Sequence, residues 1–419
     1  MRPLPRSIAA TLVAAAVAAC GDNRPAEPDA RAGAGDLPDP ADLPILDAPP
    51  DPFVTFTGAS ITTPAQWAAV RRPELERLFR HYVYGFAPPA PGNTTVTELA
   101  AADLAGGVSY REYEVRFGPA ATPPLHLAVF RPTAATAPVP VFLILNACGN
   151  HTVSAAPEVR TSTAWSDSGC DPARGSQADR FAIDAIIGRG AALATFHQSD
   201  VALDDPRDEL TSGVFAHFTI DAPAKARWGT LAAWSFGMSR AIDALLTRPE
   251  LDGARIATVG HSRRGKVALL TAAVDDRVAM ALPHQSGTGG ATLTRSDLGE
   301  PVWSINLAFP HWFDDHYVGF GDEERRLPVD QHLLIALVAP RPVLISNGAD
   351  DTWADPPGAL RAAELADPVY ELLGRPGLVT DGAGAIDPTG DLVWHQRDGG
   401  HALEGRDWVT FLDFAAAHW

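Results

Sequence analysis

The fold of this chain is decided by Ile256-Ala257-Thr258-Val259-Gly260-His261-Ser262-Arg263-Arg264-Gly265-Lys266-Val267-Ala268-Leu269-Leu270. The opening four residues predict a short buried strand, and the residues from Arg263 onward predict a helix. Between them, Gly260 and Ser262 form the Gly-x-Ser pattern of a nucleophile elbow, a sharp turn that exposes a serine hydroxyl at the end of a strand. Backbone N–H groups at the helix start can then face a developing oxyanion.

The elbow departs from the usual pattern at one position. A glycine ordinarily stands two residues after the serine, whereas here Arg264 stands there and Gly265 follows it. The local sequence leaves one alternative, in which Ser262 only caps an ordinary helix.

Short apolar runs alternate with helical periodicity on both sides of the elbow. The expected strands are 110–117, 125–130, 139–145, 191–196, 256–259, 278–283, 342–346 and 392–396, and the expected helices are 228–246, one from 263, and 407–417. The first strands are separated by Pro-rich turns and should be antiparallel. The alternation predicts an α/β-hydrolase fold, a three-layer sandwich with a mostly parallel central sheet. We expect one catalytic domain, 52–419.

A serine nucleophile needs a histidine base and an acid that orients the histidine. In this fold the acid follows the serine in the chain, and the histidine follows the acid. The strand 342–346 leads into a loop with two adjacent carboxylates, Asp350 and Asp351. Asp351 matches the Gly-x-x-Asp spacing from Gly348 better, although the sequence does not exclude Asp350 as the acid.

The base is expected at His401, on a Gly-Gly loop between the strand 392–396 and the last helix. His395 lies within the strand, and His261 adjoins the serine but should face away from it. The alternative for His401 is an ordinary surface histidine.

Four further histidines do not suggest a metal site, because they lack a helical i,i+4 pair with an acidic third ligand. They are His284, His311, His316 and His332. No metal and no cofactor are expected.

The charge of the chain disfavours nucleic acid as a partner. Its 51 acidic residues outnumber 33 Lys and Arg residues, for a formal net charge of -18. The only lysines are Lys225 and Lys266. Beyond the first 20 positions, no apolar run is long enough to predict a membrane span.

The N-terminus predicts export. Arg2 and Arg6 precede a short apolar stretch and Val17-Ala18-Ala19-Cys20, which resembles a bacterial lipobox whose cysteine is lipidated. The alternative is an ordinary signal peptide with a chance cysteine. We expect a signal peptide at 1–20, lipidation at Cys20, a disordered acidic, Pro-rich linker at 21–51, and a monomer in the cell envelope, periplasmic or anchored to the outer membrane.

Two further cysteines, Cys148 and Cys170, would then lie in a compartment that permits disulfides. We expect them to be paired, with two buried free thiols as the alternative.

Several motifs together resemble the glucuronoyl esterases of carbohydrate esterase family 15. The elbow 260–266 is similar to that family's Gly-x-Ser-Arg-x-Gly-Lys signature, which accounts for the displaced glycine. Other similar segments are Asn146 with 149–152, Ser286-Gly287-Thr288-Gly289-Gly290, Phe309-Pro310-His311-Trp312-Phe313, 327–332 and Trp353-Ala354-Asp355-Pro356. The overall likeness extends from about residue 60 to the end.

The resemblance implies an esterase that cleaves 4-O-methyl-glucuronoyl esters between glucuronoxylan and lignin alcohols. It implies Ser262 as nucleophile, His401 as base and Arg263 as oxyanion donor. It also implies that the uronate is contacted by three residues, namely Lys266, Glu300 and Trp353.

One position departs from the fungal members, which carry an acid just before the Ser-Gly-x-Gly-Gly segment. Here that position is Gln285, which cannot hold a charge. The resemblance to bacterial members then gives the acid role to Asp351, as the strand-end argument does.

Two other functions remain open. Another serine hydrolase, such as an acetyl xylan esterase or a peptidase, would share the triad but not the two cationic side chains, Arg263 and Lys266, expected at the floor of the site. A non-catalytic carbohydrate-binding lipoprotein would use aromatic residues in a cleft, for which Trp303, Trp312 and Trp353 are candidates.

Overall fold

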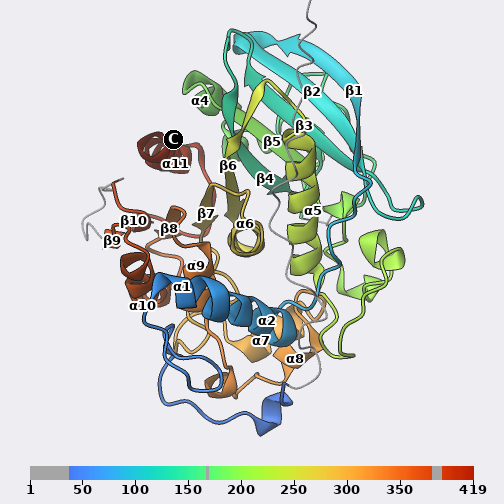
Figure 1. Cartoon of the computed structure of the whole chain (residues 1–419). Helices are drawn as coiled ribbons and strands as arrows, with labels where there is room; N and C mark the ends of the chain where they lie inside the picture. Colours follow the sequence, from blue (N-terminus) through green and yellow to red (C-terminus); the bar gives the residue numbers. More distant parts are fainter. Residues whose placement is uncertain (1–36, 167–168, 380–388) are drawn as a thin grey trace, which may run out of the picture.

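The structure is a computed structural model that describes residues 37–166, 169–379 and 389–419. One ten-stranded sheet forms its centre, in the order β1-β2-β3-β5-β4-β6-β7-β8-β10-β9 (Figure 1). The strands are β1 (Thr95–Leu104), β2 (Val108–Arg116), β3 (Leu125–Pro132), β4 (Val139–Asn146), β5 (Ala192–His197), β6 (Leu251–His261), β7 (Met280–His284), β8 (Val343–Gly348), β9 (Leu378–Val379) and β10 (Leu392–Arg397).

The strands from β5 to β9 in that order run parallel, and β1, β2 and β3 form an antiparallel extension. The prediction of a mostly parallel sheet with antiparallel leading strands is therefore confirmed. The edge strand β1 was not expected, because its Ala-rich sequence lacks the alternation of a half-buried strand.

Helices cover both faces of the sheet. One apolar core is shared by α2 (Arg72–Tyr82), α5 (Thr230–Leu245), α6 (Arg263–Val274), α9 (Gln331–Val338) and α10 (Pro356–Leu372), and a second by α3 (Ala178–Phe181), α4 (Ile183–Gly188) and α11 (Gly405–His418). Side chains of β4 alternate between the two, with Leu143 in the first and Phe142 in the second. The result is the three-layer α/β-hydrolase sandwich. The short helices α1 (Pro64–Gln66), α7 (Val302–Ala308) and α8 (Asp315–Val318) complete the set.

The parallel strands bring distant loops to one edge of the sheet. His261 of β6 pairs with His284 of β7, and His284 pairs with Ser346 of β8. Ser346 also pairs with His395 of β10. The loops that follow these four strands therefore meet at their shared carboxyl edge, where ligands bind in open parallel sheets.

The folded domain begins earlier than expected. Of the linker expected at 21–51, the segment from residue 37 onward lies against the domain, with Leu43 only 1% exposed. Leu46 donates its N–H to the carbonyl oxygen of Arg325 at 2.9 Å, and His332 lies 2.8 Å from that of Pro50. A boundary at 52 is therefore too late, since these contacts make residues 37–51 part of the fold. The expected signal peptide, 1–20, and the expected lipidation site Cys20 lie outside the described residues.

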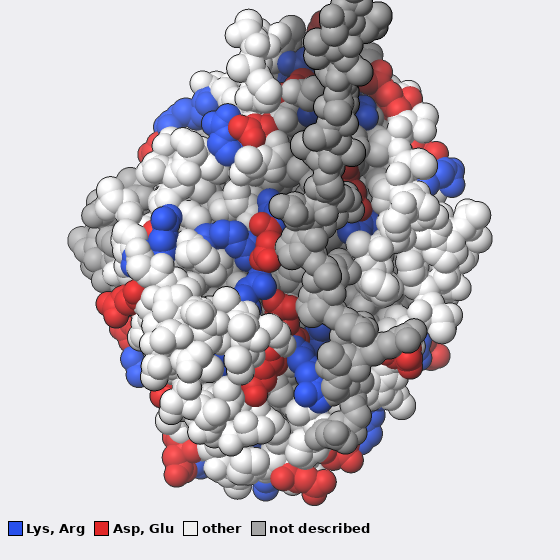
Figure 2. Space-filling model, in the orientation of Figure 1, with Lys and Arg blue, Asp and Glu red and all other residues white. Residues whose placement is uncertain are grey.

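The helices within the described ranges include none that is long and apolar enough to cross a membrane. On the face seen in Figure 2, basic side chains lie among acidic ones. The charge of this face is therefore mixed.

Candidate active site

Ser262 stands at the turn between β6 and α6 with φ 59° and ψ −130°, a backbone conformation that non-glycine residues rarely adopt. A Cβ atom at Gly260 would lie 2.0 Å from the carbonyl oxygen of Arg264, so only glycine lets strand and helix approach this closely. Gly265 occupies a similarly tight place, since a Cβ there would lie 2.9 Å from the oxygen of Gly260. The displaced glycine thus serves the same turn.

The Ser262 side chain makes no capping hydrogen bond to α6 among the residues described. A capping serine would accept a hydrogen bond from a backbone N–H of the first turn of the helix, and Ser262 does not, so the capping alternative is not supported. Its backbone N–H donates to the carbonyl oxygen of His284 at 3.0 Å, which ties the elbow to the end of β7.

His401 lies against Asp351. The distance from its Nδ1 to the Asp351 Oδ2 is 2.6 Å, and the carboxylate is buried while 42% of the histidine side chain is exposed. Asp350 is exposed, and its backbone N–H donates to the carbonyl oxygen of Gly399 at 3.0 Å. Of the two adjacent carboxylates, it is Asp351 that contacts the imidazole.

The structure also places the His401 ring beside the elbow. The ring of His261, the residue before Ser262, has its centroid 4.4 Å from that of His401. Because Asp351 occupies Nδ1, Nε2 is the nitrogen of His401 that can serve a hydroxyl. Ser262, Asp351 and His401, predicted from three separate strand ends, share one edge of the sheet.

Arg263, the first residue of α6, has its guanidinium fixed from two sides. Its Nη1 lies 2.6 Å from the Asp204 Oδ2. Its Cζ lies 4.7 Å above the centre of the Phe309 ring and 4.5 Å above that of Trp312. The two rings are stacked in parallel, 3.7 Å apart. The guanidinium is therefore held in one place before any ligand arrives.

Asp204 binds four donors at once, one of which is the Gln198 Nε2 at 3.5 Å from its Oδ2. Its Oδ1 lies 3.0 Å from the His311 Nε2 and accepts from the Trp312 Nε1 at 2.8 Å, in addition to the bond from Arg263. Burial alone would raise the pKa of Asp204, but the bond from His311, the charge of Arg263 and the bond from Trp312 hold it well below its usual value. The carboxylate therefore stays ionised. Sequence reasoning missed this residue, since no motif surrounds it.

Lys266 lies one turn into α6 and is 4% exposed. Its Nζ donates to the carbonyl oxygens of Ser286, at 2.8 Å, and Thr288. Burial lowers its pKa to about 8, against the charge of Glu300, which favours the protonated form. One of the chain's two lysines is thus a buried cation one turn of helix from Ser262.

Glu300 and Trp353, the other two residues expected to contact substrate, are neighbours. The Glu300 N–H donates to the carbonyl oxygen of Trp353 at 3.1 Å, and the Glu300 carbonyl oxygen accepts from the Thr288 hydroxyl at 2.7 Å. Glu300 is 9% exposed, whereas Trp353 is 55% exposed. The segment 286–288 therefore connects both residues to Lys266.

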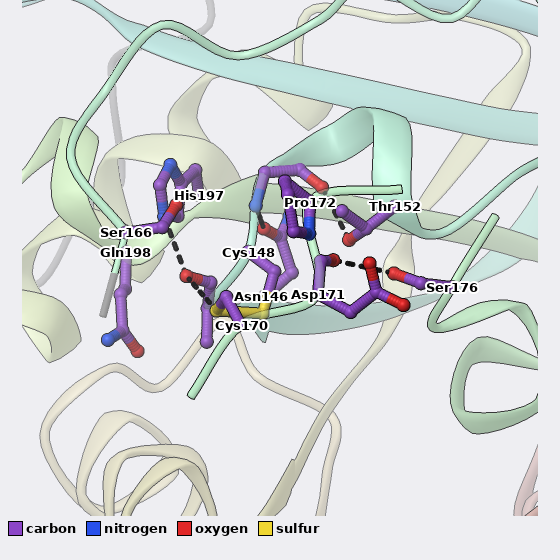
Figure 3. The surroundings of a disulfide bond; sticks show 12 residues. Asn146, Cys148, Thr152, Ser166, Cys170, Asp171, Pro172, Ser176, His197 and Gln198 are labelled. Carbon is purple, nitrogen blue, oxygen red and sulfur yellow. Dashed lines mark hydrogen bonds between the residues drawn. A yellow bond between two sulfur atoms is a disulfide. The ribbon is translucent and has the colours of Figure 1, made fainter. Parts of the chain in front are cut away.

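Cys148 and Cys170 form a disulfide with an S–S distance of 2.07 Å, as expected (Figure 3). Cys148 follows the end of β4, where Asn146 accepts from the N–H of Gly149 at 2.8 Å. The carbonyl oxygen of Ala147 lies 2.8 Å from the Nε2 of His197. The disulfide thus fastens a long loop to the same carboxyl edge that carries the elbow.

The three tryptophans considered for a binding cleft differ in exposure. Trp312 is buried beneath Arg263, whereas Trp303 and Trp353 are about half exposed, so two of the three could meet a polymer. Within the described ranges, no group of three or more His, Cys, Asp or Glu residues is arranged to hold a metal ion.

Fold and site together define a carboxylic ester hydrolase of the α/β-hydrolase fold. The model of the family described as "Glucuronyl esterase, fungi" matches residues 175–374. The carbohydrate esterase MZ0003, from an unknown prokaryotic organism, is 38% identical over 391 residues, which cover 88% of this chain and 89% of the relative.

A 4-O-methyl-glucuronoyl methylesterase of Wolfiporia cocos is 29% identical over 351 residues, or 78% of this chain and 72% of that protein. The solved structure of a promiscuous CE15 esterase from the marine bacterial metagenome superposes with a TM-score of 0.83 at 36% identity, covering 91% of this chain and 99% of the other. The chain belongs to the glucuronoyl esterases of carbohydrate esterase family 15.

Proposed function

We propose that this protein hydrolyses uronate esters, specifically 4-O-methyl-glucuronoyl esters that join glucuronoxylan to lignin alcohols. The observation that carries the proposal is the 2.6 Å contact between Asp351 and His401 beside the strained Ser262 elbow. Membership of the family and the curated relative named as a 4-O-methyl-glucuronoyl methylesterase support the choice of substrate.

In the first step, the His401 Nε2 removes the proton of the Ser262 hydroxyl, and the oxygen attacks the carbonyl carbon C6 of the uronate. Asp351 holds the ring through Nδ1 and stabilises the imidazolium that forms. Collapse of the tetrahedral intermediate breaks the bond to the alcohol, which leaves with the proton from Nε2. The product of this step is an acyl-enzyme on Ser262.

In the second step, a water molecule gives its proton to His401 and attacks the acyl carbon, which releases the uronate and restores Ser262. In both steps the negative oxygen faces the start of α6 and the guanidinium of Arg263. One such donor contributes on the order of 3 kcal/mol to transition-state stabilisation in related acyl transfer. Asp204 and the two stacked rings hold this donor in place.

Recognition of the uronate is assigned to Lys266, Glu300 and Trp353. The ammonium group of Lys266 would bind sugar hydroxyls, and its charge would favour a uronate in an otherwise acidic protein. Trp353 offers an exposed indole face against which a sugar ring can pack.

The test compares wild type and Ser262→Ala on methyl esters of glucuronate and galacturonate and on p-nitrophenyl acetate. We expect the wild type to hydrolyse the glucuronate ester with the highest kcat/KM and Ser262→Ala to lose at least about 10³-fold. Equal activity of Ser262→Ala and wild type would remove the enzymatic proposal and favour a carbohydrate-binding protein. A preference for the acetate ester would favour a general carbohydrate esterase instead.

We also propose that the chain is exported and held at the membrane by a lipid on Cys20, with the folded domain acting as a monomer. The disulfide supports export, because such bonds persist in oxidising compartments. Labelled palmitate should enter the full-length protein in bacterial cells and not its Cys20→Ala variant. Equal labelling of the two would contradict the anchor, and the mass of the purified domain in solution tests the monomer.

A further inference from the structure

The side chain of Gln285, the residue after β7, holds the loop that carries His401. Its Nε2 donates to the carbonyl oxygen of Gly400 at 2.8 Å, and its Oε1 accepts from the N–H of Ala402 at 2.9 Å. These two hydrogen bonds hold the backbone of Gly400, just before His401, and of Ala402, just after it. The Gln285 amide therefore fixes the loop on both sides of His401, whereas Asp351 holds the imidazole itself and the side chains of His284 and Arg397 bond the carbonyl oxygen of Ala402.

The same amide also orders a second imidazole. The Gln285 Oε1 lies 3.0 Å from the Nε2 of His261, and because this oxygen can only accept, the hydrogen-bond network assigns the proton of His261 to Nε2. Burial and the neighbouring His284 lower the pKa of His261 well below its usual value. A neutral ring of fixed orientation thus packs beside His401.

Gln285 is itself rigidly placed. It is 1% exposed, has φ 46°, and donates its backbone N–H to the carbonyl oxygen of Ser346 at 2.8 Å. A Cβ atom on Gly348 would lie 2.4 Å from the Gln285 Nε2 and 2.5 Å from the Gly399 oxygen. The amide and the loop therefore pack tightly against the end of β8, the strand that leads to Asp351.

We propose that Gln285 is a positioning residue, which sets the distance between the His401 imidazole and the Ser262 hydroxyl by fixing the loop on both sides of His401. An amide suits this task because it supplies a donor and an acceptor from one rigid group. The inference rests on the proposed function only in that it requires Ser262 and His401 to react as a pair.

The test uses Gln285→Met, which keeps the length of the side chain and removes all three hydrogen bonds. The rate constant for labelling of Ser262 by a fluorophosphonate, and kcat on p-nitrophenyl acetate and on methyl glucuronate, should each fall about 10²-fold. KM should stay within about twofold, since no substrate contact is removed. Gln331→Met is the matched control, because Gln331 is equally buried in α9 and should leave all three rates unchanged.

A second measurement separates positioning from a general loss of stability. In an Asp351→Asn background, where His401 is already misoriented, Gln285→Met should cost less than about threefold. Gln285→Glu keeps the accepting oxygen but loses the donor to Gly400, and it should show an intermediate loss of roughly tenfold. It also serves as the test if the Met variant does not fold.

Two results would overturn the proposal. One is a folded Gln285 variant, judged by thermal unfolding, that labels at the wild-type rate. The other is an equal proportional loss in the wild-type and Asp351→Asn backgrounds. Failure of the wild type on uronate esters alone, with normal labelling of Ser262, would refute the proposed substrate and not the role of Gln285.

Discussion

The carboxylate of Asp204 and the guanidinium of Arg263 lie 2.6 Å apart, although 59 positions separate them in the chain. This ion pair, in which the carboxylate side chain is 1% exposed, fixes the cation that follows the proposed nucleophile. The oxyanion donor that we propose at Arg263 would stabilise the transition state best if it is oriented in advance.

Asp204→Asn should therefore lower kcat on glucuronate esters by about 10²-fold, with a smaller change in KM. It should also lower the free energy of unfolding by about 2 kcal/mol, because the guanidinium of Arg263, whose side chain is 24% exposed, loses its counter-charge. Steady-state kinetics and urea denaturation measure the two effects. Asp205→Asn, at the adjacent carboxylate that pairs with the exposed Arg207, should leave kcat unchanged and lower the free energy of unfolding by much less than Asp204→Asn does, and similar losses in both variants would contradict this role of Asp204.

The contact between Asp351 and His401 predicts a sharp difference between two adjacent carboxylates. Asp351→Asn should lower kcat by up to about 10⁴-fold, since the amide favours the wrong tautomer of the imidazole. Asp350→Asn should keep nearly full activity. Steady-state rates of both variants on the glucuronate ester decide the matter, and the reverse order of losses would transfer the acid role to Asp350.

The lowered pKa of Lys266 predicts a pH dependence of substrate binding. Above pH about 8 the amine loses its charge, so KM for the glucuronate ester should rise between pH 8 and 10 while KM for p-nitrophenyl acetate stays level. Lys266→Met should raise KM for the uronate ester and remove this pH dependence, whereas Lys225→Met should behave as wild type. A KM for the glucuronate ester that does not change with pH in the wild type would exclude a charge-dependent role.

The same shift predicts how Lys266 affects stability. Its pKa is lower in the folded state than the value of 10.5 expected in the unfolded chain. Between pH 8 and 10.5 the unfolded state therefore binds more protons, so the contribution of Lys266 to the free energy of unfolding rises with pH. Denaturation of wild type and Lys266→Met measures this contribution. The free energy of unfolding of the wild type minus that of the variant should be larger at pH 10 than at pH 7.5. No change in the difference would mean that the amine titrates normally.

The disulfide should stabilise the fold. It closes a loop with a sequence separation of 22 residues, for which chain entropy predicts about 3 kcal/mol. Chemical reduction of the wild type should lower its Tm. The double substitution Cys148→Ser/Cys170→Ser, without reduction, should lower the Tm by the same amount. An unchanged Tm after verified reduction would show that packing alone holds this loop.

Local sequence predicted the parts of the fold whose patterns are strong over short distances. The buried strands β4 and β8 are apolar runs between turns, and their ends lie within two residues of the expected bounds, whereas β6 begins five residues before the expected 256–259. The helices α2 and α10 were not predicted. The Ala-rich strand β1 is stabilised by its pairing with β2, despite a bulge between Glu98 and Ala100, and a local pattern cannot show such pairing.

The same division holds for the site. The shared location of Ser262, Asp351 and His401 could be predicted because each follows the end of a strand, and parallel strands bring those ends together. Asp204 and the role of Gln285 could not, since their partners are decided by loop packing. Only the finished fold shows that one aspartate meets Arg263 and Trp312, and that one glutamine spans the backbone on either side of a histidine.

The two hydrogen bonds that hold the Lys266 ammonium group have a consequence for selectivity. An ammonium group has three N–H donors, and the carbonyl oxygens of Ser286 and Thr288 occupy two of them. One N–H donor is left for a ligand, and its direction is fixed because the other two are engaged. In its proposed role, the lysine would therefore select for the position of a sugar oxygen atom as well as for the charge of the molecule, and epimers of equal charge should bind with unequal affinity.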